Sequence, residues 1–389
     1  MLLQNSCIGV IGSGAMGSGI AQVAASSGHK VMVFDNSSSA LEKAKKNLQA
    51  SLQKLVEKQK ITTEHSNSIF QNTHFITELE DLKHCDLIIE AIIENLEIKQ
   101  KLFSELEKIA KHGCVFASNT SSLSITSIAS SCKHPELFLG IHFFNPATLM
   151  PLVEIIPGLA SDEKTVGDVK NLISAWGKVT VLAKDTPGFI VNRVARSFYG
   201  EALRIYEEGI ADFATIDWAM KEIGGFKMGP FELMDLIGHD VNYVVTETVW
   251  KQFYFDPRFK PSLSQKRLLE AGFLGRKSSR GFYNYAEGQI SPQPNKDIVL
   301  GHAVFNRIIA MLINEAADTL YLKIAGKEDI DLAMTKGVNY PKGLLKWADE
   351  IGLKTVLDTL INLNELYQED RYRPCILLKE MVKHKRSFY

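Results

Sequence analysis

The sequence predicts an α/β domain built on a doubly wound, largely parallel sheet, followed by two all-α helical domains related by internal duplication. Short apolar runs alternate with helical patterns over the first 185 residues, which is typical of such a sheet. Beyond residue 187 the patterns are helical, with few candidates for strands. With 389 residues, the chain is long enough for two or three domains. The expected strands are residues 8–11, 31–34, 86–91, 114–118, 138–143, 152–156 and 179–183.

Two breaks in the pattern set the expected domain boundaries. The first is Asp185-Thr186-Pro187-Gly188, where proline and glycine mark the change from alternating to helical patterns. The second is the polar, proline-containing segment 287–295, which is typical of a linker. The predicted domains are therefore residues 1–185, 186–288 and 289–389.

The two helical stretches resemble each other when the chain is shifted on itself by 114 residues, the separation of Asn192 and Asn306. The same shift also pairs Gly229 with Gly343 and continues without a gap to Ile237-Gly238 and its counterpart. Chance matches do not usually keep one register for that long. Because two copies are too few for a solenoid, we expect a duplicated helical domain whose copies pack as a pair.

Residues 8–36 place a glycine fingerprint between two apolar runs. The glycines have the spacing GxGxxG: the first makes a tight turn, the second lets the backbone approach a pyrophosphate, and the third lets the next helix pack closely. That helix would direct its N-terminal N–H groups toward the phosphates. The expected cofactor-binding residues are Gly12, Gly14, Ala15, Met16 and Gly17.

Asp35 ends the second apolar run and indicates which dinucleotide is bound. An acid at this place accepts both ribose hydroxyls of the adenosine and would repel a 2′-phosphate. The sequence therefore predicts a Rossmann-type domain that binds NAD rather than NADP. FAD would use the same fingerprint, so the motif alone does not name the reaction.

Composition excludes several other classes of protein. The net charge is −1, with 45% hydrophobic and 23% charged residues, which argues against nucleic-acid and membrane-surface partners. No apolar run is expected to span a bilayer, and the first strand leaves no room for a secretory signal, so a cytoplasmic location is expected. The five cysteines have no CxxC spacing, which predicts buried thiols and neither a metal site nor a disulfide scaffold.

Polar side chains directly beyond the expected strands are the candidates for catalysis. Removal of hydride from an alcohol carbon needs a base for the hydroxyl proton, and histidine is best matched to neutral pH. His142 ends an apolar strand, and Glu154 on the next strand could fix its tautomer and stabilise the imidazolium. The same residues also fit structural roles: a buried histidine, a glutamate facing solvent, a helix cap at Ser121, and a cap or buried amide at Asn192.

In combination, these motifs resemble the L-3-hydroxyacyl-CoA dehydrogenase family over essentially the first 285 residues. The motifs that carry the resemblance are GxGxxG, IIENLEIK, SNTSSL, HFFNP, DTPGFIVNR, MGPFELMD and GFYNY. The resemblance implies reversible, NAD-dependent oxidation of an L-3-hydroxyacyl-CoA to the 3-ketoacyl-CoA, with a short acyl chain such as that of 3-hydroxybutyryl-CoA.

The resemblance also implies a role for particular residues. His142 resembles the general base and Glu154 its orienting carboxylate. Ser121 and Asn192 resemble the donors that hold the reacting end of the substrate. The implied cofactor contacts outside the fingerprint are Glu94, Lys99, Asn119 and Ser121, and the implied coenzyme A contacts are Ser51 and Lys58.

Two other functions compete with this interpretation. A related hydroxyacid dehydrogenase acting on a substrate without coenzyme A would often carry a lysine where this chain has Asn192-Arg193. A non-catalytic NAD(H)-binding module would need the fingerprint but not the four catalytic residues together.

The duplication bears on the oligomeric state. The resemblance implies that family members with one helical domain use that domain to dimerise. This chain is therefore expected to be a monomer with an internal pseudo-dimer of helical domains, or a homodimer. The second copy lacks the DTPG segment and has KGLLKWAD in place of MGPFELMD, so it is expected to support the fold rather than to catalyse.

Overall fold

A computed structural model describes residues 5–389. The chain divides into two compact units, the first ending at Thr186 and the second running from Pro187 to Tyr389. The predicted subdivision of the second unit near residue 288 stays a prediction, because both helical stretches pack into that one unit.

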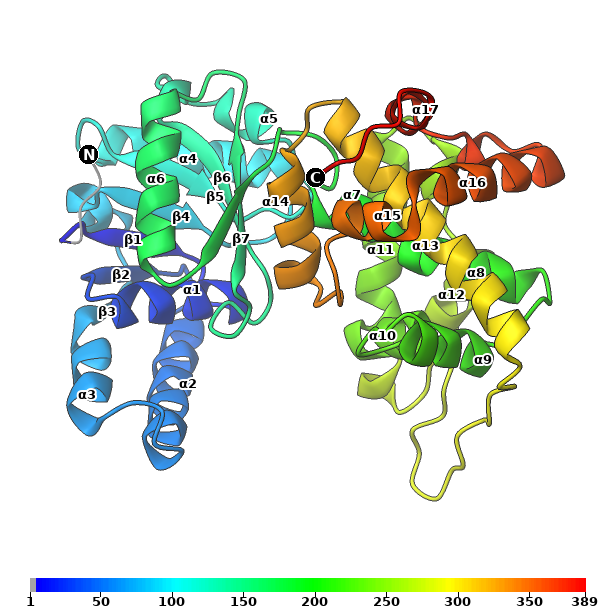
Figure 1. The fold of residues 1–389 in the computed structure, drawn as a ribbon. Helices are drawn as coiled ribbons and strands as arrows, with labels where there is room; N and C mark the ends of the chain where they lie inside the picture. Colours follow the sequence, from blue (N-terminus) through cyan, green and yellow to red (C-terminus); the bar gives the residue numbers. More distant parts are fainter. Residues whose placement is uncertain (1–4) are drawn as a thin grey trace. The chain divides into compact units, whose positions relative to one another are not determined.

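The first unit is built on an eight-stranded sheet in the order β3-β2-β1-β4-β5-β6-β7-β8 (Figure 1). All neighbouring strands are parallel except β6 and β7, which confirms the doubly wound, largely parallel sheet. The edge strand β3 is missing from the prediction because only Thr73 of its four residues is buried. The strands are β1 (Ile8–Ile11), β2 (Val31–Phe34), β3 (Thr73–Ile76), β4 (Leu87–Glu90), β5 (Val115–Ser118), β6 (Phe138–Phe143), β7 (Leu152–Pro157) and β8 (Val179–Leu182).

Helices flank this sheet, and one pair extends from it. Helix α2 buries an apolar stripe at Leu41, Ala44, Leu48 and Leu52, whose spacing of three to four residues marks a single helical face. Its other faces are exposed, and it packs against α3 in a helical hairpin (Figure 1). The helices of the first unit are α1 (Ala15–Ser26), α2 (Ser38–Glu57), α3 (Thr63–Asn72), α4 (Leu96–Ile109), α5 (Ile125–Ala129) and α6 (Glu163–Ala175).

The second unit is helical apart from short bridges, and its longest helix, α13, packs against α8 and α16. Its first half contains α7 (Val191–Val194), α8 (Arg196–Glu207), α9 (Phe213–Trp218), α10 (Pro230–Ile237), α11 (His239–Gln252) and α12 (Leu263–Glu270). Its second half contains α13 (Ile298–Tyr321), α14 (Lys327–Leu332), α15 (Leu344–Ile351), α16 (Leu353–Tyr367) and α17 (Ile376–Lys383).

Some helices of the first half have a counterpart 114 residues further along the chain. Helices α9 and α10 recur with identical bounds as α14 and α15, and a π-helical turn follows both α9 and α14. Gly238 and Gly352 end the matched helices with φ of 98° and 90°, a left-handed conformation that favours glycine.

Two buried ion pairs join the halves reciprocally. Arg193 Nε lies 2.5 Å from Glu315 Oε1, and Arg307 Nε lies 2.6 Å from Glu201 Oε1. The two arginines occupy matched positions, and so do the two glutamates.

Helix α13 corrects one expectation from the sequence. Its 24 residues include a window with a mean hydropathy of 1.3, so by length and composition it is able to cross a membrane. Asn306 and Arg307 interrupt its apolar sequence, which is why no spanning run was predicted. Because 67% of that window is buried inside the structure, α13 has the environment of a core helix.

Candidate active site

The glycine fingerprint joins β1 to α1. Gly12 has a φ of 97°, and a Cβ atom there would lie 2.6 Å from the carbonyl oxygen of Ala91. A Cβ atom on Gly17 would lie 1.8 Å from the Gly12 oxygen, so the helix is able to pack this closely only because the residue is glycine. A Cβ atom on Gly14 would meet nothing within 4 Å, which leaves open space for a ligand.

The N-terminus of α1 offers unpaired donors beside that space. Gly14 is its N-cap and provides no side-chain cap, and Ala15 and Met16 form the start of the first turn. The backbone N–H groups of such a turn and the positive end of the helix dipole favour an anion. These features fit the pyrophosphate of NAD.

Asp35 lies at the end of β2, beside the fingerprint. Its Oδ2 atom accepts hydrogen bonds from the backbone N–H and the hydroxyl of Ser13, both at 2.8 Å, and Oδ1 accepts one from the Ser37 N–H at 3.0 Å. Burial raises the pKa of Asp35, but these hydrogen bonds outweigh it and hold the pKa below its usual value. The carboxylate is therefore ionised at neutral pH, as recognition of a ribose requires.

A pocket of about 780 Å³ opens at the carboxyl ends of β1 and β2, with Gly12 and Asp35 in its lining. Its opposite side is apolar and includes Ile92, Ile93 and Ile98. Ile93 is 64% exposed and Ile98 is 44% exposed, so both offer apolar surface that a bound base would cover. The pocket therefore suits the adenosine part of a dinucleotide.

Glu94 and Lys99, both predicted cofactor contacts, lie together beyond β4. Lys99 Nζ is 3.4 Å from Glu94 Oε2. Burial raises the pKa of Glu94, but Lys99 and hydrogen bonds from Thr120 and Ser122 bring it below its usual value. The two side chains therefore form a charged pair at this edge of the sheet.

Sequence reasoning missed Glu90, which anchors Lys99. Glu90 is fully buried at the end of β4, and its Oε1 atom lies 2.5 Å from Lys99 Nζ. It also accepts a hydrogen bond from Ser118 Oγ at 2.6 Å. The available signal was an acidic residue at the end of an apolar strand. Its partners Lys99 and Ser118 lie 9 and 28 residues further along the chain, so the sequence does not show the contacts.

The loop after β5 brings two more predicted residues, Asn119 and Ser121, to this edge. The backbone N–H of Ser121 donates to Glu94 Oε1 at 3.1 Å. Asn119 Oδ1 accepts a hydrogen bond from the N–H of Phe143, the residue after His142, at 2.9 Å. No hydrogen bond of the Ser121 hydroxyl is found within residues 5–389.

His142 and Glu154 form a buried pair on neighbouring strands. The antiparallel register of β6 and β7 places them directly opposite each other, and His142 Nδ1 lies 2.7 Å from Glu154 Oε2. His142 is 5% exposed and Glu154 is fully buried, so the alternative in which the glutamate faces solvent is wrong. The carboxylate is placed to hold the ring in one orientation and to stabilise its protonated form.

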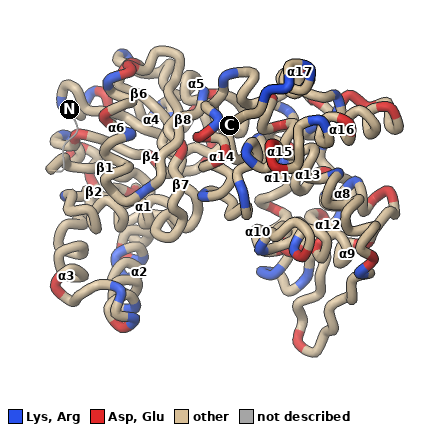
Figure 2. Tube along the Cα trace, viewed as in Figure 1, with Lys and Arg blue, Asp and Glu red and all other residues tan. Residues whose placement is uncertain are grey.

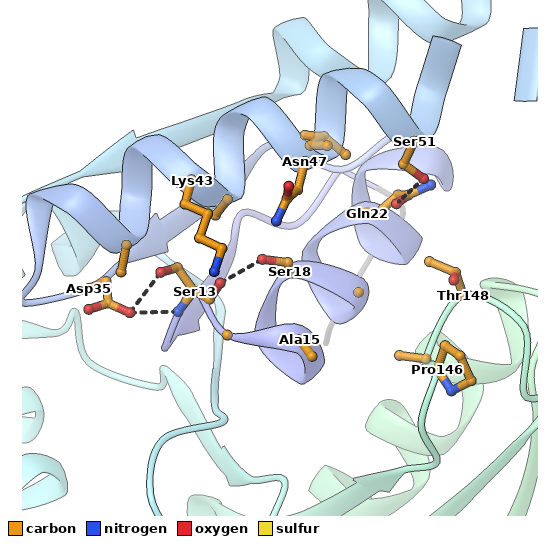
Figure 3. A pocket seen from close by; sticks show the side chains of 16 residues that line it. Ser13, Ala15, Ser18, Gln22, Asp35, Lys43, Asn47, Ser51, Pro146 and Thr148 are labelled. Carbon is orange, nitrogen blue, oxygen red and sulfur yellow. Dashed lines mark hydrogen bonds between the residues drawn. The ribbon is translucent and has the colours of Figure 1, made fainter. Parts of the chain in front are cut away.

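A second pocket of about 630 Å³ lies between α1, α2 and the segment 146–148 (Figure 3). Ser51 lines it, and its hydroxyl donates to Gln22 Oε1 at 3.5 Å. Lys43 and Asn47 line it too and lie at intervals of four residues from Ser51 on one face of α2 (Figure 3). Lys58, the other predicted coenzyme A contact, is the C-cap of α2 and lies outside this lining.

Asn192, the fourth predicted catalytic residue, belongs to the second unit, whereas the other three belong to the first. It lies in α7, and its backbone oxygen accepts a hydrogen bond from Arg196 Nε at 3.0 Å. No hydrogen bond of its side chain is found within residues 5–389. The amide is therefore not used as a helix cap.

The remaining candidates have structural surroundings. Asp185 of the DTPG segment accepts hydrogen bonds from the N–H groups of Ile125 and Thr126, so it caps α5. The cysteines are free thiols, of which Cys7 and Cys132 are partly exposed and the other three buried. Within residues 5–389 no group of three or more His, Cys, Asp or Glu could hold a metal ion.

Two family profiles match this chain. The family profile for the NAD-binding domain of 3-hydroxyacyl-CoA dehydrogenase matches residues 7–186. The profile for the C-terminal domain of the same enzyme matches residues 188–285 and 303–387.

Individual relatives cover the whole chain or its first part. The 3-hydroxyadipyl-CoA dehydrogenase of Escherichia coli K12 is 37% identical, over 98% of both chains. The probable 3-hydroxybutyryl-CoA dehydrogenase of Deinococcus radiodurans is 42% identical over 71% of this chain and 99% of its own length. A crystal structure of 3-hydroxybutyryl-CoA dehydrogenase from Escherichia coli K12 matches with a TM-score of 0.92 and 36% identity, over 98% of this chain and 99% of that one. The chain therefore belongs to the 3-hydroxyacyl-CoA dehydrogenase family of NAD-dependent oxidoreductases.

Proposed function

We propose that this enzyme interconverts L-3-hydroxyacyl-CoA and 3-ketoacyl-CoA with His142 as its general base. The observation that carries the assignment is the buried pair of His142 and Glu154, with 2.7 Å between Nδ1 and Oε2. The pair lies in the sheet that carries the glycine fingerprint, so base and cofactor site belong to one unit.

The proposed chemistry assigns one task to each side chain. NAD, when bound, supplies the hydride acceptor. Because Nδ1 of His142 is held by Glu154, Nε2 is the atom that takes the proton of the C3 hydroxyl, and Glu154 stabilises the resulting imidazolium. Ser121 and Asn192 donate hydrogen bonds to the reacting end of the substrate, which positions it and stabilises developing negative charge.

The proposed cofactor contacts surround the same edge of the sheet. Lys99, held by Glu90 and Glu94, offers a fixed positive charge there, while Asn119 and Ser121 extend from the next strand. For coenzyme A we propose Ser51 together with Lys43 and Asn47, because the three share one pocket lining. Lys58 remains a proposed coenzyme A contact at the exposed end of α2.

The names of the relatives suggest two short substrates with different ends. The acyl chain of 3-hydroxybutyryl-CoA ends in a methyl group, whereas that of 3-hydroxyadipyl-CoA ends in a carboxylate. We propose a short chain of one of these two types.

For the second helical stretch we propose an internal duplicate that takes the place of a partner subunit. The matched helices and the reciprocal arginine–glutamate pairs support this. A further match escaped sequence reasoning: Asp235 accepts from the N–H groups of Phe282 and Tyr283, as Asp349 does from Phe388 and Tyr389. The chain is then a monomer with an internal pseudo-dimer; a homodimer is the alternative outcome of a mass measurement.

A cytoplasmic location, and the lack of nucleic-acid and membrane partners, stay predictions. Lys and Arg are interspersed with Asp and Glu along both units (Figure 2), and the net charge is −1. Both observations favour a protein without a strongly charged docking face.

The proposed function is tested by the absorbance of NADH in the reductive direction. We expect rapid oxidation of NADH with acetoacetyl-CoA, little with free acetoacetate, and a marked preference for NADH over NADPH. Equal rates with the thioester and the free acid would favour the dehydrogenase of non-CoA substrates. Binding of NADH without turnover of either would favour the non-catalytic module.

A further inference from the structure

Arg196 is a buried arginine without an acidic partner. It begins α8, four residues after Asn192 of α7, and is 7% exposed. No carboxylate within residues 5–389 forms an ion pair with it. The neighbouring buried arginine, Arg193, is paired with Glu315 and Asp318.

The hydrogen bonds of Arg196 use Nε and Nη1 of its guanidinium group but not Nη2. Nε donates to the Asn192 carbonyl at 3.0 Å, and Nη1 donates to Thr246 Oγ1 at 3.1 Å and to the Asn242 carbonyl at 3.5 Å. No acceptor for Nη2 is found within residues 5–389. Burial lowers the pKa of Arg196, and the ring of Tyr199, 4.9 Å away, is its nearest aromatic contact. A buried cation in this state lacks the counter-charge that proteins normally supply.

Two more buried polar groups near Arg196 have no partner. Asn242 Nδ2 and the Tyr340 hydroxyl are both inaccessible and form no hydrogen bond in the described structure. The backbone of Asn242 already contacts Arg196, and Tyr340 lies close enough to interact with its charge. Unsatisfied donors around an unpaired cation are the composition of an anion site.

The second helical stretch shows that the packing does not require these polar residues. The positions 114 residues beyond Arg196, Asn242 and Thr246 are Ala310, Val356 and Leu360. All three are buried at 2% exposure or less. The second stretch therefore buries apolar residues at these positions, so its fold does not depend on a polar set there.

We propose that Arg196 binds a carboxylate at the far end of the acyl chain and so selects substrates of the dicarboxylyl-CoA class. The inference rests on the proposed function, in which Asn192 holds the reacting end of the substrate. Arg196 Nε lies 3.0 Å from the backbone oxygen of Asn192, so a short acyl chain held at Asn192 is able to reach the guanidinium group. The N–H donors of Nη2, for which no acceptor is found within residues 5–389, suit a carboxylate oxygen.

The test compares two substrates that differ only in the acyl chain, 3-hydroxyadipyl-CoA and 3-hydroxybutyryl-CoA. Wild-type enzyme is expected to have the higher kcat/KM with 3-hydroxyadipyl-CoA. In Arg196→Met the ratio of the two kcat/KM values should fall about 10- to 100-fold, the worth of hydrogen bonds to a charged group. Arg196→Lys keeps the charge but not the planar guanidinium group that places Nη2, so its ratio should lie between the two.

Arg204→Met is the matched control, because Arg204 lies on the same helix and is buried beside Glu201. It should lower the melting temperature without changing the ratio. An equal loss of activity with both substrates in Arg196→Met would overturn the proposal, since a structural role or a contact with the phosphates of coenzyme A affects both alike.

The wild-type preference is a second test that needs no variant. If the wild type turns over 3-hydroxybutyryl-CoA and shows no preference for 3-hydroxyadipyl-CoA, the proposed role of Arg196 is refuted and the proposed function is not. Turnover of neither substrate with NAD would refute the proposed function itself.

Discussion

Replacing Arg307 with methionine is expected to destabilise the second unit, because it leaves a buried acid without its main partner. Arg307 Nε lies 2.6 Å from Glu201 Oε1, and its Nη1 and Nη2 atoms bind Glu208. Removing one member of a buried ion pair costs about 3–5 kcal/mol. The lower end, about 3 kcal/mol, applies here because Arg204 stays 3.5 Å from Glu201.

This loss should lower the melting temperature by roughly 6–12 °C, at about 2–4 °C per kcal/mol for a unit of this size. Urea titration followed by circular dichroism measures the free energy of unfolding directly. The double variant with Glu201→Gln should recover part of the loss, with a coupling of at least about 0.5 kcal/mol, because the orphaned charge is gone. A loss below about 1 kcal/mol in Arg307→Met would refute the view that these pairs hold the two halves together.

Two further predictions test the site, and a third concerns Asp217, a buried residue of α9 that accepts hydrogen bonds from the N–H groups of Phe231 and Glu232. Asp35→Ser should raise the KM for NAD and reduce the preference of the enzyme for NAD over NADP, because the acceptor for the ribose hydroxyls and the repulsion of a 2′-phosphate are both lost. If the wild type uses NADP as well as NAD, Asp35 has no such role. Asn192→Ala should lower kcat/KM at least tenfold, whereas Asn306→Ala should leave it within about twofold of the wild-type value. An equal loss of kcat/KM in both variants would refute the proposal that only the first half contributes to catalysis. Burial raises the pKa of Asp217 from 3.8 to about 7. Between these two values the folded state keeps a proton that the unfolded chain releases. The stabilisation by protonated Asp217 is therefore lost as the pH rises from about 4 to about 7. Asp217→Asn should therefore gain in unfolding free energy relative to wild type between about pH 4 and pH 7, and a constant difference across that range would contradict the assignment.

The sequence was sufficient wherever the signal is local. The fingerprint, Asp35 and seven of the eight strands follow from glycine spacing and short apolar runs, and the order of strands then places His142 and Glu154 on neighbours. The antiparallel register that sets them opposite each other is a tertiary feature, as is the full burial of Glu154.

The residues that sequence reasoning missed are those defined by distant partners. Glu90 is an acid in an apolar strand until its contact with Lys99 is seen. Lys43 and Asn47 look like a solvated helix face until the pocket beside α1 is known. Arg196 follows Asn192, a predicted catalytic residue, by four residues. Only the structure shows that Arg196 is buried and forms no ion pair within residues 5–389.

The central claim is that His142 is the base for hydride transfer from C3, and single-turnover kinetics test it most directly. L-3-hydroxybutyryl-CoA deuterated at C3 is mixed with excess enzyme and NAD, and the label in the reduced cofactor is followed in wild type and His142→Gln. The account predicts transfer of deuterium to the cofactor in wild type, a rate about 10²- to 10⁴-fold lower in His142→Gln, and nearly unchanged affinity for NADH. A variant rate within a few-fold of wild type would contradict it.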